Sequence, residues 1–253
     1  MAIQKSEAIV LKTSDFRETS LVVNLFTKDF GKLGGLIKGI RLTPQRYGGM
    51  PLIFSRSSIV FYQNPKRDLS LVTQCDAQEQ FLPIREDLEK TAYANYFLEL
   101  LDTVTQDYDK NERLFELTVD ALRALCHTRE SWRIARIFEI RLLNFSGFKP
   151  RLDSCVNCQK EIVQEARLKT GGQGRFSSIL GGILCERCFG HDKNAQATLK
   201  GTLASIEYIE KSDWSKALRL KIAPDIAAEL VTILNSFLDI HLDKEIKSRK
   251  FLH

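Results

Sequence analysis

Short runs of alternating hydrophobic and polar residues fill the first eighty positions of the chain. Alternation of this kind predicts half-buried β-strands, because successive side chains of a strand point to opposite faces. Turn-forming residues such as Asp29, Gly31 and Pro65 separate the runs. With no long helix between them, the runs favour a small closed barrel of the OB-fold type, which protects its edges by curling on itself. Strands are predicted at residues 8–11, 21–26, 33–37, 57–62 and 69–73.

The hydrophobic period changes to that of helices after about residue 83. Apolar residues then recur every three or four positions, which places them on one face of a helix. Three helices are predicted before Gly147, and Pro150 prevents the last of them from continuing. Two more are predicted after residue 193, the second beginning near Pro224. These apolar stripes are typical of a buried core and by themselves indicate no ligand.

Two Cys-x-x-Cys pairs lie between these helical regions, at Cys155 and Cys158 and at Cys185 and Cys188. Each pair turns two thiolates inward, and four thiolates are the ligand set of a structural, tetrahedral zinc site. Such a closed set leaves no position for a substrate, so the ion would stabilise the fold and do no chemistry. Two disulfides, or a redox-active pair, are the alternatives.

A small hairpin is expected between the cysteine pairs, with residues 165–170 facing residues 174–180 across a glycine turn. The chain is therefore predicted to be an α+β multidomain protein with an N-terminal OB-fold β-barrel and a C-terminal helical domain that carries an inserted four-cysteine zinc module. The predicted segments are an OB-fold nucleic-acid-binding domain at 1–80, a first helical part at 81–149, the zinc module at 150–192 and a C-terminal helical part at 193–253.

Composition and charge narrow the class of protein. A hydrophobic content of 43% and a charged content of 27% are ordinary for a globular protein and exclude a disordered chain. The net charge of +5 favours a polyanionic partner, and the basic excess lies in residues 1–80 and 151–253. No signal-peptide core follows Met1, and no apolar stretch approaches the roughly 20 residues needed to span a bilayer. A cytoplasmic protein with no membrane partner is expected.

Sequence signatures of catalysis are absent. The chain has no Gly-x-x-x-x-Gly-Lys-Ser/Thr loop, no Gly-x-Ser-x-Gly elbow and no His-Glu-x-x-His motif. His191 follows the second cysteine pair, but four thiolates already complete a zinc shell. We therefore expect a binding protein rather than an enzyme.

The most suggestive binding feature is a glycine-rich loop at residues 38–49, which combines cations with an aromatic ring. No acidic residue occurs in residues 31–67. Proteins that bind single strands use cations to follow the phosphates and rings on which bases stack. The alternative is a solvated, flexible loop. The predicted DNA-binding residues are Lys38, Arg41, Arg46, Tyr47, Lys66 and Arg67.

Two further basic clusters lie outside this loop. Arg133 and Arg136 lie beside Trp132 on a predicted helix, a combination that can hold an acidic peptide end. A salt-bridged helix face is the alternative. The second cluster is either a solvated tail or part of a nucleic-acid path, and it consists of Lys244, Lys247, Arg249 and Lys250.

Taken together, these residues resemble the RecO family of bacterial recombination mediators. Lys38-Gly39-Ile40-Arg41 is similar to a Lys-Gly-Ala-Arg segment of that family, although further cations often follow there and Leu42-Thr43-Pro44 follow here. The other stretches that carry the resemblance occur in order along nearly the whole chain. They are Ala8-Ile9-Val10-Leu11-Lys12, Arg17-Glu18-Thr19-Ser20-Leu21, Arg136-Ile137-Phe138-Glu139-Ile140-Arg141-Leu142-Leu143, Gly147-Phe148-Lys149-Pro150, Gly181-Gly182-Ile183-Leu184-Cys185 and Lys247-Ser248-Arg249.

The resemblance implies an OB domain, a helical domain and a four-cysteine module with Zn²⁺ as a structural cofactor. It implies binding of single- and double-stranded DNA, annealing of complementary strands, and loading of RecA, together with RecR, onto DNA coated by single-strand-binding protein (SSB). It also implies contact with the acidic C-terminal tail of SSB, for which Trp132, Arg133 and Arg136 are the candidate receptor on chemical grounds. The expected location is the bacterial cytoplasm, at the nucleoid.

Two other function classes stay open. A zinc-finger enzyme that processes nucleic acids would need a cleft of carboxylates or histidines, and no such spacing is evident. An RNA-binding accessory protein would share the basic loop and the zinc module but would prefer RNA to DNA.

Overall fold

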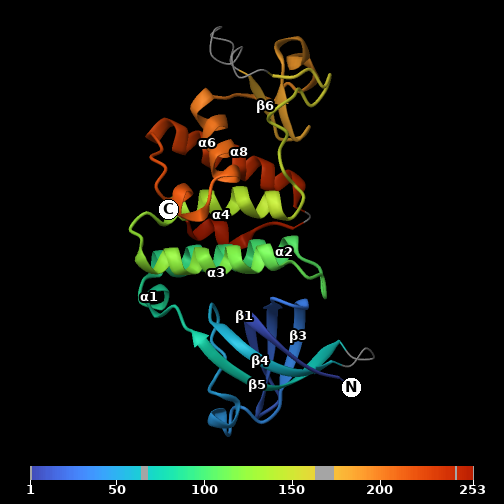
Figure 1. Cartoon of the computed structure of the whole chain (residues 1–253), viewed down its shortest axis with the longest axis vertical. Coiled ribbons are helices and arrows are strands. Elements are labelled where there is room, and N and C mark those ends of the chain that lie inside the picture. The colour runs from blue at the N-terminus through green and yellow to red at the C-terminus, as the bar shows by residue number, and fades with distance from the viewer. Residues whose placement is uncertain (1, 64–67, 163–173, 243, 253) are drawn as a thin grey trace. The chain divides into compact units, whose positions relative to one another are not determined.

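The computed structural model describes residues 2–63, 68–162, 174–242 and 244–252 (Figure 1). The chain divides into two compact units. Unit 1 comprises Met1–Ser131 and Ile246–His253, and unit 2 comprises Trp132–Glu245. No helix in the described ranges is long and apolar enough to cross a membrane. The division into four segments with separate roles, made from the sequence, stays a prediction.

Five strands of unit 1 form a closed barrel in the order β1-β2-β3-β5-β4. Neighbouring strands are antiparallel except β3 and β5, which pair in parallel over a short stretch. Every predicted strand is present, and together with the helical C-terminal region this confirms the predicted fold class. The strands are β1 (Ala2–Phe16), β2 (Ser20–Thr27), β3 (Gly31–Ile37), β4 (Arg56–Gln63) and β5 (Leu69–Glu79).

Strand β1 is longer than predicted because its two halves pair with different neighbours. Ala2–Ile9 pairs with β4, whereas Ala8–Phe16 pairs with β2. The register shifts between Val10 and Lys12, and such a bulge bends a strand. The bent strand thereby belongs to both sides of the closed sheet.

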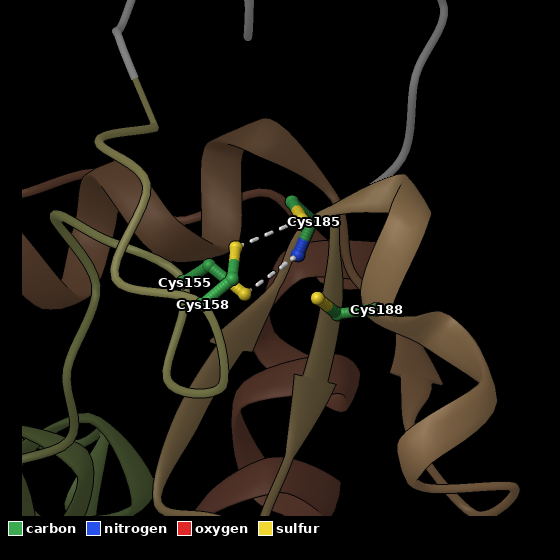
Figure 2. A group of neighbouring side chains, drawn as sticks. All are labelled: Cys155, Cys158, Cys185 and Cys188. Atoms are coloured by element: carbon green, nitrogen blue, oxygen red, sulfur yellow. Dashed lines mark hydrogen bonds between the residues drawn. The ribbon is translucent and has the colours of Figure 1, made fainter.

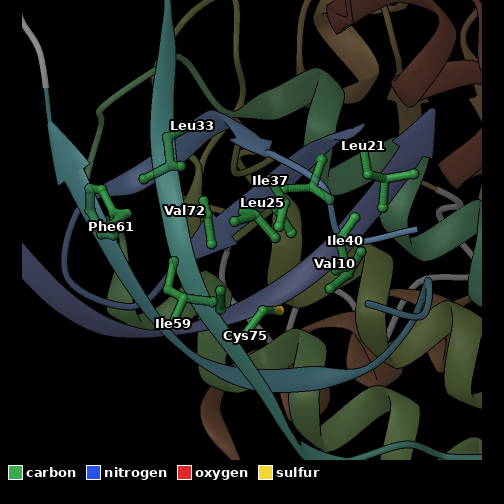
Figure 3. Close-up of a cluster of buried hydrophobic side chains, with 12 residues drawn as sticks. Val10, Leu21, Leu25, Leu33, Ile37, Ile40, Ile59, Phe61, Val72 and Cys75 are labelled. Carbon is green, nitrogen blue, oxygen red and sulfur yellow. The ribbon is translucent and has the colours of Figure 1, made fainter. Parts of the chain in front are cut away.

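Inward-pointing side chains fill the barrel (Figure 3). Buried and half-buried positions alternate along β3, as the period of a strand requires. Gly35 allows close packing there, because an added Cβ would lie 2.6 Å from Cγ2 of Val72. The buried cluster consists of Ala8, Val10, Leu21, Val23, Leu25, Leu33, Ile37, Ile40, Ile59, Phe61, Val72 and Cys75.

Helices complete unit 1: α1 (Leu82–Arg85), α2 (Leu88–Val104), α3 (Glu112–His127) and the short C-terminal helix η3 (Lys247–Phe251). Asp87 and Asn111 cap α2 and α3, each accepting a backbone N–H of the first turn. Glu99 of α2 accepts the backbone N–H groups of Lys247 and Ser248. The end of the chain is thereby held on α2.

Ion pairs join the barrel to α3. Lys28, in the turn after β2, lies 2.6 Å from Glu116 and 3.3 Å from Glu112. Hydrogen bonds to these two carboxylates raise the pKa of Lys28. Arg123 of α3 donates to both carboxylate oxygens of Glu79 in β5. The helices and the barrel of unit 1 are thus connected by charge as well as by apolar packing.

Unit 2 holds a second, smaller sheet of three strands in the order β7-β6-β8. Only the second strand of the predicted hairpin falls within the described residues, and β6 forms there. Strand β6 pairs with β7 and β8, and residues 165–170 lie outside the described residues. The elements of unit 2 are α4 (Ser131–Phe145), β6 (Arg175–Ser177), β7 (Gly182–Leu184), η2 (Glu186–His191), β8 (Gln196–Ala197), α6 (Lys200–Lys211), α7 (Trp214–Leu218) and α8 (Pro224–His241).

Candidate metal centre and nucleic-acid interface

Four cysteine side chains from two loops converge in unit 2 (Figure 2). Cys155 and Cys158 lie on the loop after α4, and Cys185 and Cys188 lie at the start of η2. Their Sγ atoms all lie within 4.8 Å of one another. Cys158 Sγ and Cys185 Sγ are 3.7 Å apart, close to the separation of about 3.8 Å expected for two thiolates at about 2.3 Å from a tetrahedral zinc ion.

Backbone hydrogen bonds shape each pair into a tight turn. The N–H of Gln159 donates to the carbonyl of Cys155 at 2.9 Å, and the N–H of Cys188 donates to the carbonyl of Cys185 at 2.7 Å. A bond of 2.9 Å from the N–H of Val156 to the carbonyl of Ile183 ties the first turn to β7. Two intervening residues are therefore enough to direct both sulfurs of a pair to one point.

The electrostatics of the cluster favour a cation at its centre. Burial opposes ionisation of Cys155, but N–H donors from Cys158, Cys185 and Asn157 outweigh it and lower the pKa of Cys155 to about 6. Burial and the neighbouring sulfurs raise the pKa of Cys185 to about 12. A positive ion at the centre would offset the repulsion between neighbouring sulfurs and so favour ionisation of Cys185.

The donor set can hold a metal ion and has no place for a reacting group. All six cysteines of the chain are described, and none forms a disulfide. His191 is exposed and is not among the converging side chains. Four sulfurs fill a tetrahedral shell, so the arrangement is that of a structural centre.

The predicted basic loop follows β3 and includes a short helix, η1 (Pro44–Tyr47). Lys38, Arg41 and Arg46 are all exposed to solvent. Lys66 and Arg67, predicted to extend this patch, lie outside the described residues. The structure thus brings three of the predicted cations to one end of the barrel, where β1 ends and β2 begins.

Tyr47 has a structural contact rather than a free ring. Its hydroxyl donates to the carbonyl of Lys38 at 2.5 Å, and its ring packs against the buried cluster of the barrel. The next residue, Gly48, has a φ of +83°, and a Cβ there would lie 1.9 Å from Oδ1 of Asp76 in β5. The loop therefore packs closely against β5.

Residues 31–67 contain no acid, but an acidic side chain from another part of the chain lies close to the basic loop. Arg41 pairs with Asp15 of β1 at 3.2 Å. Its N–H also donates to the carbonyl of Thr19 at 3.0 Å, which joins the basic loop to the turn between β1 and β2.

That turn contributes two residues that sequence reasoning did not select for DNA binding, Phe16 and Arg17. The guanidinium of Arg17 lies over the Phe16 ring, 5.3 Å from its centroid. In the sequence, the turn stands out only for its family resemblance. An aromatic residue next to a cation at a strand end is the signal that could have found it.

The arginines of α4 are used inside unit 2. Arg136 is 4% exposed and donates to Glu139 at 2.6 Å. Arg133 donates to the carbonyl of Leu218 at the end of α7, and Arg141 to that of Ser212 at the end of α6. Such carbonyls lack partners within their helices and attract cations. Trp132 and Arg133 are half-buried, so of the three predicted receptor residues only Arg136 is fully buried.

Comparison with known proteins agrees with this architecture. The family model described as "Recombination protein O N terminal" matches residues 1–81, and "Recombination protein O C terminal" matches residues 85–250. The chain is similar to proteins named "DNA repair protein RecO" from several bacteria. It is 33% identical to that of Moorella thermoacetica over 98% of this chain and 90% of the relative. It is 32% identical to that of Alkaliphilus metalliredigens, over 95% and 94%, and 32% identical to that of Bacillus pumilus, over 98% and 93%. The chain therefore belongs to the RecO family of DNA repair proteins.

Proposed function

We propose that this chain is a mediator of DNA repair and recombination that makes and breaks no covalent bonds itself. In this proposal it binds single- and double-stranded DNA, anneals complementary strands, and works with RecR to help load RecA onto DNA coated by SSB. Family membership supports the repair role. Its place of action would be the bacterial cytoplasm, at the nucleoid.

The observation that carries the DNA-binding part is the exposed trio Lys38, Arg41 and Arg46 at one end of a closed barrel. Cations at such a site neutralise phosphates and release counterions, which drives association with any sequence. The attachment of this loop to β5 and to the β1–β2 turn holds the cations in place before DNA arrives. Less ordering is then needed on binding.

We propose further that the cysteine cluster holds Zn²⁺ as a structural ion. The converging sulfurs and their opposed pKa shifts support this role. The acidic tail of SSB remains a predicted partner, with Trp132, Arg133 and Arg136 as its predicted receptor. The burial of Arg136 counts against direct contact by that residue, so Trp132 and Arg133 are the better candidates.

The DNA-binding proposal is tested by replacing Lys38, Arg41 and Arg46 together with alanine. The salt slope is the slope of the logarithm of the binding constant against the logarithm of the salt concentration. Each lost phosphate contact reduces its magnitude for single strands by about 0.7, so the slope should fall by about 2. Binding is measured by fluorescence anisotropy of a labelled strand over a range of salt concentrations. Annealing of complementary strands without Mg²⁺ or ATP is measured in parallel.

A matched control removes three exposed cations from unit 2, by Lys160→Ala, Lys193→Ala and Lys221→Ala. It changes the net charge equally, so it separates the local patch from overall charge. An unchanged salt slope in the loop variant would exclude the loop from the interface. Strand cleavage by the wild type would instead favour a processing enzyme, and a preference for RNA would favour an RNA-binding protein.

A further inference from the structure

Two exposed apolar side chains lie among the cations of the basic loop. Leu42 directly follows Arg41 and is 73% exposed. Phe16, at the end of β1, is 36% exposed although the Arg17 guanidinium lies over its ring. A single exposed apolar side chain is common on protein surfaces and by itself indicates no ligand. Two such side chains set among cations fit a ligand that carries both negative charge and flat apolar faces.

The two residues belong to one end of the barrel. Leu21 pairs with Ile37 across β2 and β3, so the turn before Leu21 and the loop after Ile37 emerge together. The hydrogen bond from Arg41 to Thr19 and the ion pair from Arg41 to Asp15 fasten the loop to the turn on both sides of Phe16. Figure 3 shows Leu21, Ile37 and Ile40, the buried residues nearest in sequence to the turn and the loop, near one another in the core cluster.

The backbone has a defined turn conformation next to Phe16 and next to Leu42. Arg17 has a φ of +55°, a left-handed conformation that is uncommon for a residue other than glycine. This conformation accompanies the placement of its guanidinium over Phe16. The N–H of Leu42 donates to the carbonyl of Gly39 at 3.1 Å, which closes a turn just before Leu42. Neither side chain therefore needs a large rearrangement to meet a ligand.

We propose that Phe16 and Leu42 contact the bases of DNA and give this interface a preference for single strands over duplex. The inference rests on the proposed DNA-binding function. One base stacks on the part of the Phe16 ring that Arg17 leaves open, and Leu42 contacts a neighbouring base. Lys38, Arg41 and Arg46 meet the phosphates. In a duplex the base faces are already stacked on one another, so only the phosphate contacts remain.

This assignment replaces Tyr47 as the stacking residue of the loop. The Tyr47 hydroxyl is bonded to Lys38 and its ring packs on the barrel core, whereas Phe16 and Leu42 have no such attachment of their side chains to the core. It also separates two kinds of contact. Phosphate contacts change the salt slope, and base contacts change affinity at every salt concentration.

The test combines protein variants with abasic DNA. Phe16→Ala should weaken binding of an ordinary single strand by about fivefold or more, as expected for one stacked base. Leu42→Ala should weaken it too, through the loss of an apolar contact with a base. The salt slope and the affinity for duplex should not change. The wild type should bind an abasic strand of the same length about as weakly as the variants bind an ordinary strand. On the abasic strand, the variants and the wild type should have equal affinity.

Conservative variants and an exposed control complete the design. Phe16→Tyr and Leu42→Met should keep wild-type affinity, and Leu88→Ala, which removes a leucine that is 87% exposed on α2, should have no effect. If Phe16→Ala lowers the thermal midpoint, Phe16→Trp provides a second measurement. Its additional fluorescence should be quenched by an ordinary strand and not by an abasic one.

Equal binding of ordinary and abasic strands by the wild type would overturn the inference. So would Phe16→Ala and Leu42→Ala variants that bind ordinary strands as the wild type does, while the Lys38, Arg41 and Arg46 variant still has a reduced salt slope. That result would leave the proposed DNA-binding function intact. Absence of any single-strand binding by the wild type would instead refute the proposed function together with this inference.

Discussion

Arg41 already has a carboxylate partner before DNA arrives, and this partner affects how the interface works. The Asp15 side chain is 67% exposed and that of Arg41 is 41% exposed, so their ion pair is a surface pair that contributes little to stability. A DNA phosphate must compete with Asp15 for the same guanidinium. The Asp15 carboxylate also repels the strand.

Replacing Asp15 with asparagine is therefore expected to strengthen DNA binding. Exposed ion pairs are worth up to about 1 kcal/mol, so the gain in single-strand affinity should reach at most about fivefold at low salt. The gain should shrink as salt screens the charges. Fluorescence anisotropy with a labelled strand measures both effects.

A matched control is Glu161→Gln, which removes an exposed acid from unit 2. This change should leave the affinity close to that of the wild type. Weaker binding by Asp15→Asn would mean that the ion pair holds Arg41 in the geometry that DNA needs.

Single residues also show why sequence reasoning about this site was incomplete. The lack of acids in residues 31–67 suggested a purely basic loop, yet Asp15 and Asp76 approach it from strands far away in the sequence. Barrel closure creates both contacts, and no local pattern reports them. The same holds for Tyr47, whose ring meets the core through the fold of the loop.

Among the elements, α4 shows most clearly how a helical pattern can mislead. Arg133 and Arg136, three residues apart, were consistent with a surface receptor, but spacing places side chains on one face of a helix without saying what covers that face. The structure gives these arginines carbonyl and carboxylate partners inside unit 2. The alternative of a salt-bridged helix comes closer to what is found.

The pair of Arg136 and Glu139 predicts a large effect on stability. Glu139 is 0% exposed, so Arg136→Ala would leave a buried carboxylate with much less compensation. Breaking a buried ion pair in this way costs about 3–5 kcal/mol. Urea denaturation should show a loss of that size, and exposed Arg129→Ala should stay within about 0.5 kcal/mol of the wild type.

A second variant separates stability from partner binding. Arg136→Met combined with Glu139→Leu removes both charges and should recover most of the lost stability. A loss below about 1 kcal/mol in Arg136→Ala would contradict the interior role of the pair. If binding of an acidic tail peptide were then lost as well, Arg136 would belong to a surface receptor.

The strands of the barrel were predictable, whereas only β6 of the small sheet was, within the expected segment 174–180. Runs such as residues 21–26 are long enough for alternation to appear, and β2 contains the whole of that run. Strand β7 has three residues and β8 has two, which is too short to show a period. The first cysteine turn is hydrogen-bonded to β7 through Val156 and Ile183, a contact that no strand pattern reports.

At the scale of the whole molecule, the proposed metal centre and the proposed DNA interface belong to different units. The cysteine cluster lies in Trp132–Glu245, and the basic loop lies in Met1–Ser131. The barrel has its own buried cluster, and η3 binds to α2 within the same unit. The contacts described above for the basic loop, to Thr19, Asp15 and β5, are contacts within unit 1.

Removing the metal is therefore expected to unfold unit 2 and to leave the barrel folded. Structural zinc sites contribute folding free energy directly, so a chelator should lower or abolish one of two calorimetric transitions. Both tryptophans of the chain, Trp132 and Trp214, lie in unit 2. Tryptophan fluorescence should follow the transition that depends on metal, while the other transition appears only in calorimetry and circular dichroism.

Variants give this prediction a test that does not depend on the chelator. Cys158→Ser should reproduce the effect of chelation, whereas Cys126→Ser changes a cysteine outside the cluster and should not. Single-strand binding by the basic loop should persist in both variants, since the cations and the barrel are unaffected. A single transition that shifts as a whole, seen equally by fluorescence and calorimetry, would show that the units fold together. The metal would then support the DNA interface indirectly, and loss of zinc would abolish DNA binding without any change in the loop.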